Sequence, residues 1–354
     1  MSLATLRTHL PTYLGSTSTL RVFKHGRFCH HANWITYGLV RSENSGRPLQ
    51  LEEIIPVIGR IDDVRSHQLI LQQLPATVDA IVSTTESLTD YVNHFNNSVK
   101  LLRTVSLAST ASGTRPLVII SSGCKDYGIG PHYHGDAGLE PHNEESPLNP
   151  PELLTIRTRS SLEIFQHKDA FAPVLVRPTN VFGRSASYYR GFFKVAAACS
   201  KLNQPLVLPV SPNSICHALH VDDCGDAYVA IANHPRLEEV EGQIFHISAW
   251  RYETVNEIAE AILAEYDIPR GLKYVQPSAL PQSENPWPVA LIDFPQWTSS
   301  TKLRKLTGWS DVRPLFSEAF HLYRLSYEAA SAVGHENIQK MMERERLFKA
   351  NYRA

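Results

Sequence analysis

Six short apolar segments, separated by helical ones, constrain the fold of this 354-residue chain more than any other feature of its sequence. They lie at residues 34–40, 54–58, 80–83, 117–121, 174–177 and 243–247. They are rich in Val and Ile and lack strict alternation, which is typical of parallel strands covered on both faces. Helical patterns lie between them, at residues 64–74, 92–111, 153–167, 224–233 and 254–266. The alternation predicts an α/β fold with right-handed βαβ units and helices on both faces of a parallel sheet.

Two late segments that are rich in aromatic residues and Pro interrupt this alternation. We therefore predict a core of residues 1–184, completed by residues 213–270, and a smaller C-terminal substrate lobe of residues 185–212 and 271–312. Residues 313–354 are helical and charged. They predict a tail that is either a solvated terminal helix or a helix that binds a partner.

The charge balance excludes some classes of partner. Lys and Arg number 34 and Asp and Glu number 35, so there is no electrostatic reason to expect nucleic acid or an anionic membrane. No apolar run approaches the ~20 residues of a membrane span. The first residues lack the apolar core of a secretory signal. We expect a cytoplasmic protein that acts on a small molecule.

The five cysteines and the clustered histidines do not indicate a metal site. No two cysteines have C-x-x-C spacing, which favours buried or free reduced thiols. His132, His134 and His142 share one polar loop, but that loop is rich in Pro and Gly and gives metal ligands no rigid scaffold. We predict no bound metal.

Seven segments, in order along most of the chain, resemble the NAD-dependent epimerase/dehydratase family, the extended and atypical short-chain dehydrogenases. They read WITYGLVRS (34–42), PVIGRIDD (56–63), VIISSGCKDYG (118–128), PHNEESPLNPP (141–151), VRPTNVFGR (176–184), HVDDCGDAY (220–228) and FPQWTSSTKLRKLTGW (294–309). The resemblance implies a Rossmann-like core, a nicotinamide dinucleotide and a small-molecule substrate. A homodimer is a possible assembly.

The family's phosphate-binding turn, G-x-x-G-x-x-G, is matched only in part by LGSTSTLR at residues 14–21. Gly15 matches the first glycine, but Ser18 and Arg21 hold the second and third positions. Side chains there crowd the approach of backbone N–H groups to the pyrophosphate. Pro11 also disfavours a central strand before the turn. Either the cofactor is held weakly, or the segment before Trp34 derives from a misassigned exon.

WITYGLVRS (34–42) resembles the second strand of the family and ends in VRS (40–42). At this strand end, members that bind NAD carry an acidic residue. Arg41 implies NADP, because a guanidinium can hold the 2′-phosphate, although a solvated Arg at a strand end is an equal alternative. Asp62 would lie near the adenine or cap the next helix. By the same resemblance, Asn180 would border the nicotinamide and Arg184 the substrate.

The family's catalytic pair, a Tyr and a Lys four residues apart, is missing. In the family the Lys lowers the pKa of the Tyr, which can then act as an acid near pH 7. Counting back from Glu163, the two positions hold Thr155 and Arg159. No Tyr occurs between Tyr133 and Tyr188, so a shift of register does not restore the pair. Thr cannot do acid–base work alone, whereas Arg keeps the positive charge.

A local resemblance suggests a substitute. SSGCKDYGIGP (121–131) is similar to the T-G-x-K-H-Y-x-G-P signature of progesterone-5β-reductase/iridoid-synthase-like enzymes, which carry a Lys in this loop and reduce enones with NADPH. Carried over, Lys125 supplies the cation and Ser122 orients the substrate carbonyl. Tyr127 or Tyr133 would donate the proton, and Arg159 would add charge near the ribose. The alternative for Lys125 and Tyr127 is an exposed, Gly-rich turn.

These features favour an NADP-dependent oxidoreductase that reduces, or epimerises, a carbonyl or enone substrate from secondary metabolism. Two other functions stay open. The fold could support dehydration, isomerisation or cyclisation without a cofactor, by positioning and acid–base groups alone. It could also be non-catalytic, as a dinucleotide sensor or a scaffold.

Overall fold

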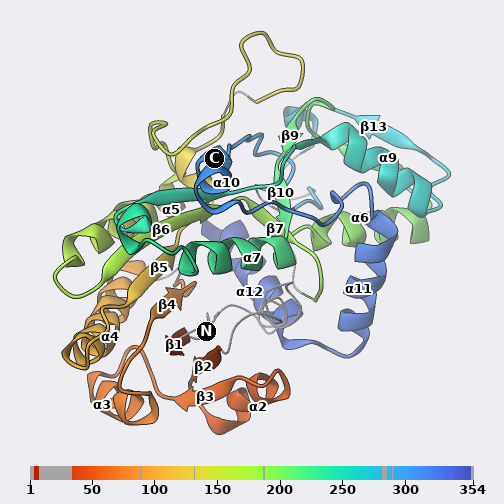
Figure 1. Cartoon of the computed structure of the whole chain (residues 1–354). Coiled ribbons are helices and arrows are strands. Elements are labelled where there is room, and N and C mark those ends of the chain that lie inside the picture. Colours follow the sequence, from red (N-terminus) through yellow and green to blue (C-terminus); the bar gives the residue numbers. More distant parts are fainter. Residues whose placement is uncertain are drawn as a thin grey trace.

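The computed structural model describes residues 4–7, 34–87, 90–130, 132–185, 188–280, 285–288 and 290–351. Its core is a seven-stranded sheet in the order β11-β6-β5-β4-β1-β2-β3 (Figure 1). The strands are β1 (Ala4–Arg7), β2 (Ile35–Val40), β3 (Ile55–Ile58), β4 (Ala80–Ser83), β5 (Leu117–Ser121), β6 (Ala172–Pro178) and β11 (Ile244–Ile247). All but β1 run parallel, and the order is that of a Rossmann-like fold. The predicted fold class is confirmed.

Helices cover both faces of the sheet. Val82 and Ile119 pack on one face with α7 and α10, whereas Ile81 and Val118 pack on the other with α3 and α4. Each predicted helix is present, with α5 continued by the 3-10 turn η3 (Glu163–His167). The helices are α2 (Glu43–Leu51), α3 (Val64–Gln73), α4 (Tyr91–Ala111), α5 (Glu152–Leu162), α6 (Arg190–Lys201), α7 (Val221–Ala232), α8 (Leu237–Val240), α9 (Val255–Glu265), α10 (Thr301–Thr307), α11 (Phe320–Ala332) and α12 (Glu336–Asn351).

The first strand departs from the parallel arrangement that the sequence predicts. β1 pairs antiparallel with both β2 and β4, and Arg7 lies opposite Ile35. β1 therefore ends at the edge where its neighbours begin. In a Rossmann fold the first strand ends at the opposite edge and leads into the phosphate-binding turn. Gly15, Ser18 and the strand predicted before them lie outside the described residues.

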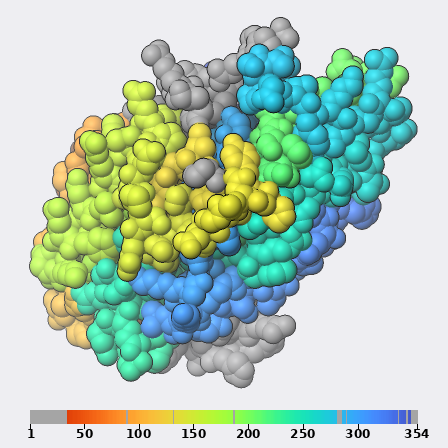
Figure 2. Space-filling model, turned by 90° about the horizontal axis from the view of Figure 1, so that it is seen from above, coloured from red at the N-terminus to blue at the C-terminus, as the bar shows by residue number. Residues whose placement is uncertain are grey.

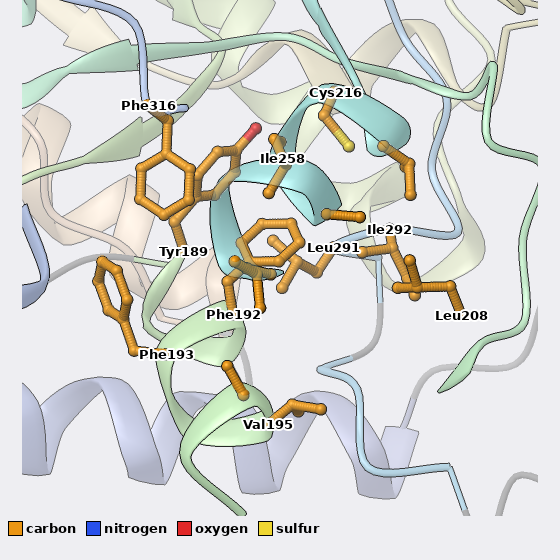
Figure 3. Close-up of a cluster of buried hydrophobic side chains, with 14 of the residues drawn as sticks. Tyr189, Phe192, Phe193, Val195, Leu208, Cys216, Ile258, Leu291, Ile292 and Phe316 are labelled. Carbon is orange, nitrogen blue, oxygen red and sulfur yellow. The ribbon is translucent and has the colours of Figure 1, made fainter. Parts of the chain in front are cut away.

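The lobe has an aromatic core of its own. Figure 3 shows the rings of Tyr189, Phe192 and Phe316 grouped together. The ring centroids of Tyr189 and Phe316 are 4.8 Å apart. Ile258 of α9 and Phe320 of α11 belong to the same cluster. Part of the segment assigned to the core, and part of the predicted tail, thus contribute to the lobe. Three strand pairs complete it: β7 (Asn180–Phe182) with β10 (Ala218–His220), β8 (Leu206–Leu208) with β13 (Leu272–Tyr274), and β9 (Ile215–Cys216) with β12 (Glu253–Thr254).

An ion pair attaches the last helix to the lobe. Arg190, the first residue of α6, is 1 % exposed and pairs with Glu345 of α12. Asn337 and Ile338, near the start of α12, are also buried. Because a buried guanidinium needs a partner, this contact fixes α12 beside α6.

The segment between β5 and α5, residues 122–151, lies between the core and the lobe (yellow in Figure 2). In Figure 1 part of it rises above the sheet. Its backbone forms isolated bridges to the lobe side, from Tyr133 to Ser214 and from His142 to Thr298. The residues that follow β5 are thus held between the two parts of the molecule.

Candidate active site

The turn after β5 carries three of the predicted catalytic residues to the carboxyl edge of the sheet. Ser122 directly follows β5, and Lys125 and Tyr127 belong to the 3-10 helix η2 (Cys124–Tyr127), which ends at Gly128 with φ +77°. A Cβ on Gly128 would lie 2.1 Å from the carbonyl oxygen of Asn149, so only glycine fits. From the lobe side, Gln296 donates to the carbonyls of Cys124 and Gly128, at 2.7 and 3.0 Å. The turn is therefore fixed on both sides.

Asp126 is the centre of a buried ionic network. It has no exposed surface, and its carboxylate accepts from Ser122 Oγ at 2.6 Å, Arg157 Nη2 at 2.6 Å, Thr158 Oγ1 at 2.8 Å and Arg177 Nε at 2.9 Å. Burial alone would raise the pKa of Asp126, but Arg157, the Ser122 hydrogen bond and Arg177 together hold it below the usual value. The carboxylate therefore stays charged at neutral pH.

This network changes the role expected of Ser122. The hydroxyl proton of Ser122 points to Asp126, so the side chain cannot donate to a substrate carbonyl without breaking that bond. A hydroxyl has one proton and spare lone pairs, so Ser122 is left as an acceptor. Its clearest structural effect is to tie the end of β5 to the η2 turn.

Tyr127 lies inside the same network rather than at an open surface. It is 2 % exposed, and its hydroxyl accepts from Arg177 Nη1 at 2.8 Å. Burial lowers the pKa of His246 to about 3, so the neutral ring can accept the Tyr127 proton at Nε2, 2.7 Å away. Burial raises the pKa of Tyr127 itself. These contacts do not support Tyr127 as proton donor to a substrate. Tyr133, the other predicted donor, is 37 % exposed on the following loop.

Lys125 points away from this network and towards the lobe. Its Nζ donates to the carbonyl oxygen of Ala290 at 2.8 Å. It also lies 4.1 Å from the ring centroid of Phe294 and 5.8 Å from that of Tyr188. Burial lowers the pKa of Lys125 to about 8, and the negative charge of Asp293 opposes this shift only in part. The side chain is thus a cation at pH 7 whose proton is unusually easy to release.

Three of the predicted cofactor residues lie within the described ranges. Each of them follows the carboxyl end of a strand of the sheet. Arg41 is exposed where β2 ends. Asp62 is engaged by Arg60, with contacts of 3.0 and 2.7 Å, and this hydrogen bond lowers the pKa of Asp62. The cap of α3 is Asp63, not Asp62. Asn180, half-buried, is the first residue of β7.

A model of the NAD-dependent epimerase/dehydratase family matches residues 26–248, which is more than half of the chain. The chain belongs to this family. The match confirms the resemblance carried by the seven segments. Among curated proteins, none matches this sequence.

Solved structures of low sequence identity share the fold of this family member. A putative epimerase from Burkholderia cenocepacia J2315 has a TM-score of 0.61 and 17% identity, over 90% of this chain and 95% of that one. UDP-glucuronic acid 4-epimerase from Bacillus cereus, in complex with UDP-glucuronic acid and NAD, has a TM-score of 0.58 and 13% identity, over 88% and 95%. RMD from Pseudomonas aeruginosa, complexed with NADPH, has a TM-score of 0.54 and 14% identity, over 78% and 90%. These likenesses concern the fold alone.

In the family, the helix that corresponds to α5 carries the catalytic Tyr and Lys. In this chain, the residues of α5 that reach the Asp126 network are not the predicted Thr155 and Arg159. Thr155 donates to the carbonyl oxygen of Pro151, the residue before α5, at 3.3 Å, and Arg159 is exposed. The structure does not bring Arg159 into the network around Asp126. Arg157 takes that place and also lies 3.3 Å from Glu86. Sequence reasoning missed Arg157 and Asp126 as members of the site.

The remaining candidate, Arg184, is occupied by a structural contact. It makes a two-pronged ion pair with Asp222, at 2.5 and 2.8 Å. Within the described ranges, no three His, Cys, Asp or Glu side chains are placed to hold a metal. No helix in the described part is long and apolar enough to cross a membrane. The described cysteines are buried free thiols, at Cys124, Cys199, Cys216 and Cys224.

Proposed function

We propose that this chain is an NADP-dependent reductase of a carbonyl or conjugated enone in a small organic molecule of the secondary-metabolite type. The observation that carries the proposal is the position of Lys125 at the carboxyl edge of β5. Its Nζ lies beside the rings of Phe294 and Tyr188, at 4.1 and 5.8 Å from their centroids. An ammonium among aromatic side chains suits a flat, largely apolar substrate with one reactive oxygen.

Lys125 would combine the two roles that the family divides between Tyr and Lys. As a cation it stabilises negative charge that develops on the substrate oxygen. With a pKa of about 8 it can also give a proton to that oxygen near neutral pH. The bond to the Ala290 carbonyl holds the amine in place before the substrate arrives. Ser122 and Tyr127 act as positioning residues, because their hydrogen bonds fix the turn that carries Lys125.

The described cofactor residues suit NADP better than NAD. The exposed guanidinium of Arg41 can hold a 2′-phosphate, whereas the Asp62 carboxylate is already bound by Arg60 and is less available to a ribose hydroxyl. Asn180 would face the nicotinamide side of the edge. When bound, the dinucleotide would supply the hydride. The residues proposed for its pyrophosphate, Gly15 and Ser18, lie outside the described ranges.

The test measures NADPH oxidation by absorbance with a panel of cyclic enones and ketones. The proposal expects turnover by the full chain and at least a hundredfold loss in Lys125→Met, a variant of similar size without the charge. NADPH binding, measured by calorimetry, should persist in this variant. Lys100→Met, on the exposed face of α4, is the matched control and should keep full activity. Turnover that is equal in Lys125→Met and the unaltered chain would refute the role given to Lys125.

A second function is favoured by one observation, the antiparallel direction of β1. Because β1 ends at the edge opposite to the carboxyl ends of its neighbours, the site around Lys125 could run an isomerisation, dehydration or cyclisation without a dinucleotide. Lys125 would then act as the acid alone. Calorimetry separates the two functions: this one predicts no heat of binding with NADPH or NADH, and the first predicts binding of NADPH. Binding without turnover of any substrate would instead favour a dinucleotide sensor.

A further inference from the structure

A second cleft lies beyond the end of β11, away from the turn that carries Lys125. Its volume is about 610 Å³, within the range of small-molecule sites. The loop after β5, the turn between β11 and α9, and the segment before α10 all line it. Neither Ser122 nor Lys125 is among the lining residues. The cleft is therefore distinct from the candidate active site.

Three aromatic side chains form the apolar part of this cleft. Trp250 is 64 % exposed, which is unusual for so large an apolar side chain. The rings of Tyr252 and Trp297 meet edge to face, with centroids 5.1 Å apart and planes at 69°. Aromatic side chains of this kind offer flat apolar faces with few internal degrees of freedom, so binding costs them little entropy.

The positions of these aromatic residues are fixed by other contacts. The backbone N–H of Trp250 donates to Asp311 at 3.0 Å. The backbone N–H of Trp297 donates to His132 Nδ1 at 3.2 Å. The Tyr252 hydroxyl is 2.8 Å from His134 Nδ1. The cleft is thus preorganised, which reduces the entropy lost on binding.

The charges of the cleft argue against an ionic ligand. Arg251 is its one lysine or arginine, and this guanidinium pairs with Glu257 at 2.7 Å and with Glu318 at 3.6 Å. Little positive charge is left for a phosphate or carboxylate. A cationic ligand is also disfavoured, because Arg251 already lies 5.7 Å from the ring centroid of Trp250. A neutral ligand suits this balance best.

Polar groups surround the aromatic faces and can bind the edge of a ligand. The lining holds no aliphatic side chain, and besides the three aromatic residues every lining residue is polar or charged. Among described residues, the carboxamide of Asn213 and Nε2 of His134 have no protein partner, so both can bond a ligand. A wholly apolar ligand would cover these groups without replacing their hydrogen bonds to water, which is unfavourable.

We propose that this cleft binds a neutral sugar ring. A pyranose has apolar C–H faces and hydroxyl groups around its edge, which match the aromatic faces and the polar rim of the cleft. The faces would stack on Trp250 and Trp297, and the hydroxyl groups would bond to Asn213 and His134. This site is independent of the reductase proposal, since it shares none of the residues assigned to that chemistry.

The test is calorimetry on the full chain with maltotriose, cellotriose and xylotriose. At least one of them should bind at millimolar concentrations, because single sugar sites are weak. Trp250→Ala and Asn213→Ala should each lower that affinity at least tenfold, whereas Leu322→Ala, an exposed apolar side chain on α11, should leave it unchanged. Trp297→Phe, which keeps an aromatic ring, should lower the affinity less than Trp250→Ala.

Three outcomes would overturn the proposal. One is that none of the three saccharides binds. Another is that a saccharide binds equally well to Trp250→Ala, which would place its site elsewhere. The third is that an ion binds in place of the saccharides. If tetramethylammonium or inorganic pyrophosphate binds, and binds more weakly to Trp250→Ala, the cleft is an ion site. Because none of these measurements uses NADPH, failure here would leave the reductase proposal untouched.

Discussion

Lys125 and Asp126 are adjacent in the chain, yet their charges are kept apart. The Lys125 ammonium bonds to Ala290 and lies beside Phe294 of the lobe, whereas the Asp126 carboxylate binds Arg157 and Arg177 in the core. The short η2 turn directs the two side chains to different parts of the molecule. Each charge therefore has its own environment: the carboxylate stabilises the turn, and the ammonium lies among aromatic side chains of the lobe side.

The first prediction concerns the pH dependence of the proposed reductase. The pKa of Lys125 is lowered from 10.5 to about 8, so the side chain is protonated below pH 8 and neutral above it. If the protonated form is the acid, kcat/KM is constant below pH 8 and falls about tenfold per pH unit above it. Steady-state rates from pH 6 to 10 check this. Lys125→Arg should be slower and should lose the decline, because Arg stays charged. Rates that rise above pH 8 would contradict the acid role.

The second prediction concerns the stability supplied by Asp126. Asp126→Asn removes the charge that compensates two buried guanidinium groups, which should lower the free energy of unfolding by ~3–5 kcal/mol. Urea denaturation followed by circular dichroism measures it. Asp169→Asn is the matched control, since Asp169 also binds an arginine in a two-pronged pair but at an exposed site. Equal effects of the two substitutions would show that burial of the Asp126 network adds nothing to stability.

The third prediction separates a structural Tyr127 from a catalytic one. Tyr127→Phe leaves Arg177 Nη1 and His246 Nε2 without their shared partner, which should lower the free energy of unfolding by ~1–3 kcal/mol. Turnover of the folded variant should change by no more than about twofold. If Tyr127 were the proton donor, turnover would instead fall by about 10²–10⁴. Denaturation and NADPH oxidation on the same preparation distinguish these outcomes.

The fourth prediction concerns the choice of cofactor. Arg41→Ala should weaken NADPH binding about ten- to one-hundredfold, as expected for loss of a charge-assisted contact. NADH binding should hardly change, because NADH has no 2′-phosphate. Arg65→Ala, at an exposed arginine in the first turn of α3, is the control. An equal loss of affinity for both cofactors in Arg41→Ala would mean that Arg41 does not read the 2′-phosphate.

The parallel strands could be predicted because β4, β5, β6 and β11 are buried along most of their length and, like the partly exposed β2 and β3, read as short segments rich in Val and Ile. β1 could not be predicted in this way, since Ala4–Arg7 is short and joins the sheet through its backbone pairing. α2 was also missed, because Gly46 and Pro48 are poor helix formers. The Ser42 cap and the burial of Leu49 accompany this helix despite them.

The candidate site was predicted in part. The strand pattern places Lys125 directly after β5, whereas the register of α5 was assigned from family spacing alone. The buried face of α5 carries Leu154, Arg157, Thr158 and Ser161, a spacing of i, i+3, i+4 and i+7. Most of these side chains are polar, so a search for apolar periodicity does not detect them. A buried polar face of this kind indicates an internal network rather than a solvated surface.

The direction of β1 also changes how the chain is threaded. Neighbouring antiparallel strands can be joined by a simple return, whereas neighbouring parallel strands need a crossover that passes over a face of the sheet. Here β1 and β2 are antiparallel neighbours, with Arg7 opposite Ile35, so their pairing requires no crossover. An interior position of the sheet, between β4 and β2, is therefore filled by a strand whose antiparallel pairing fixes no handedness. A change in the first residues of such a chain would therefore reach β2 and β4 through the backbone pairing of β1, without altering the parallel pairing of the other six strands.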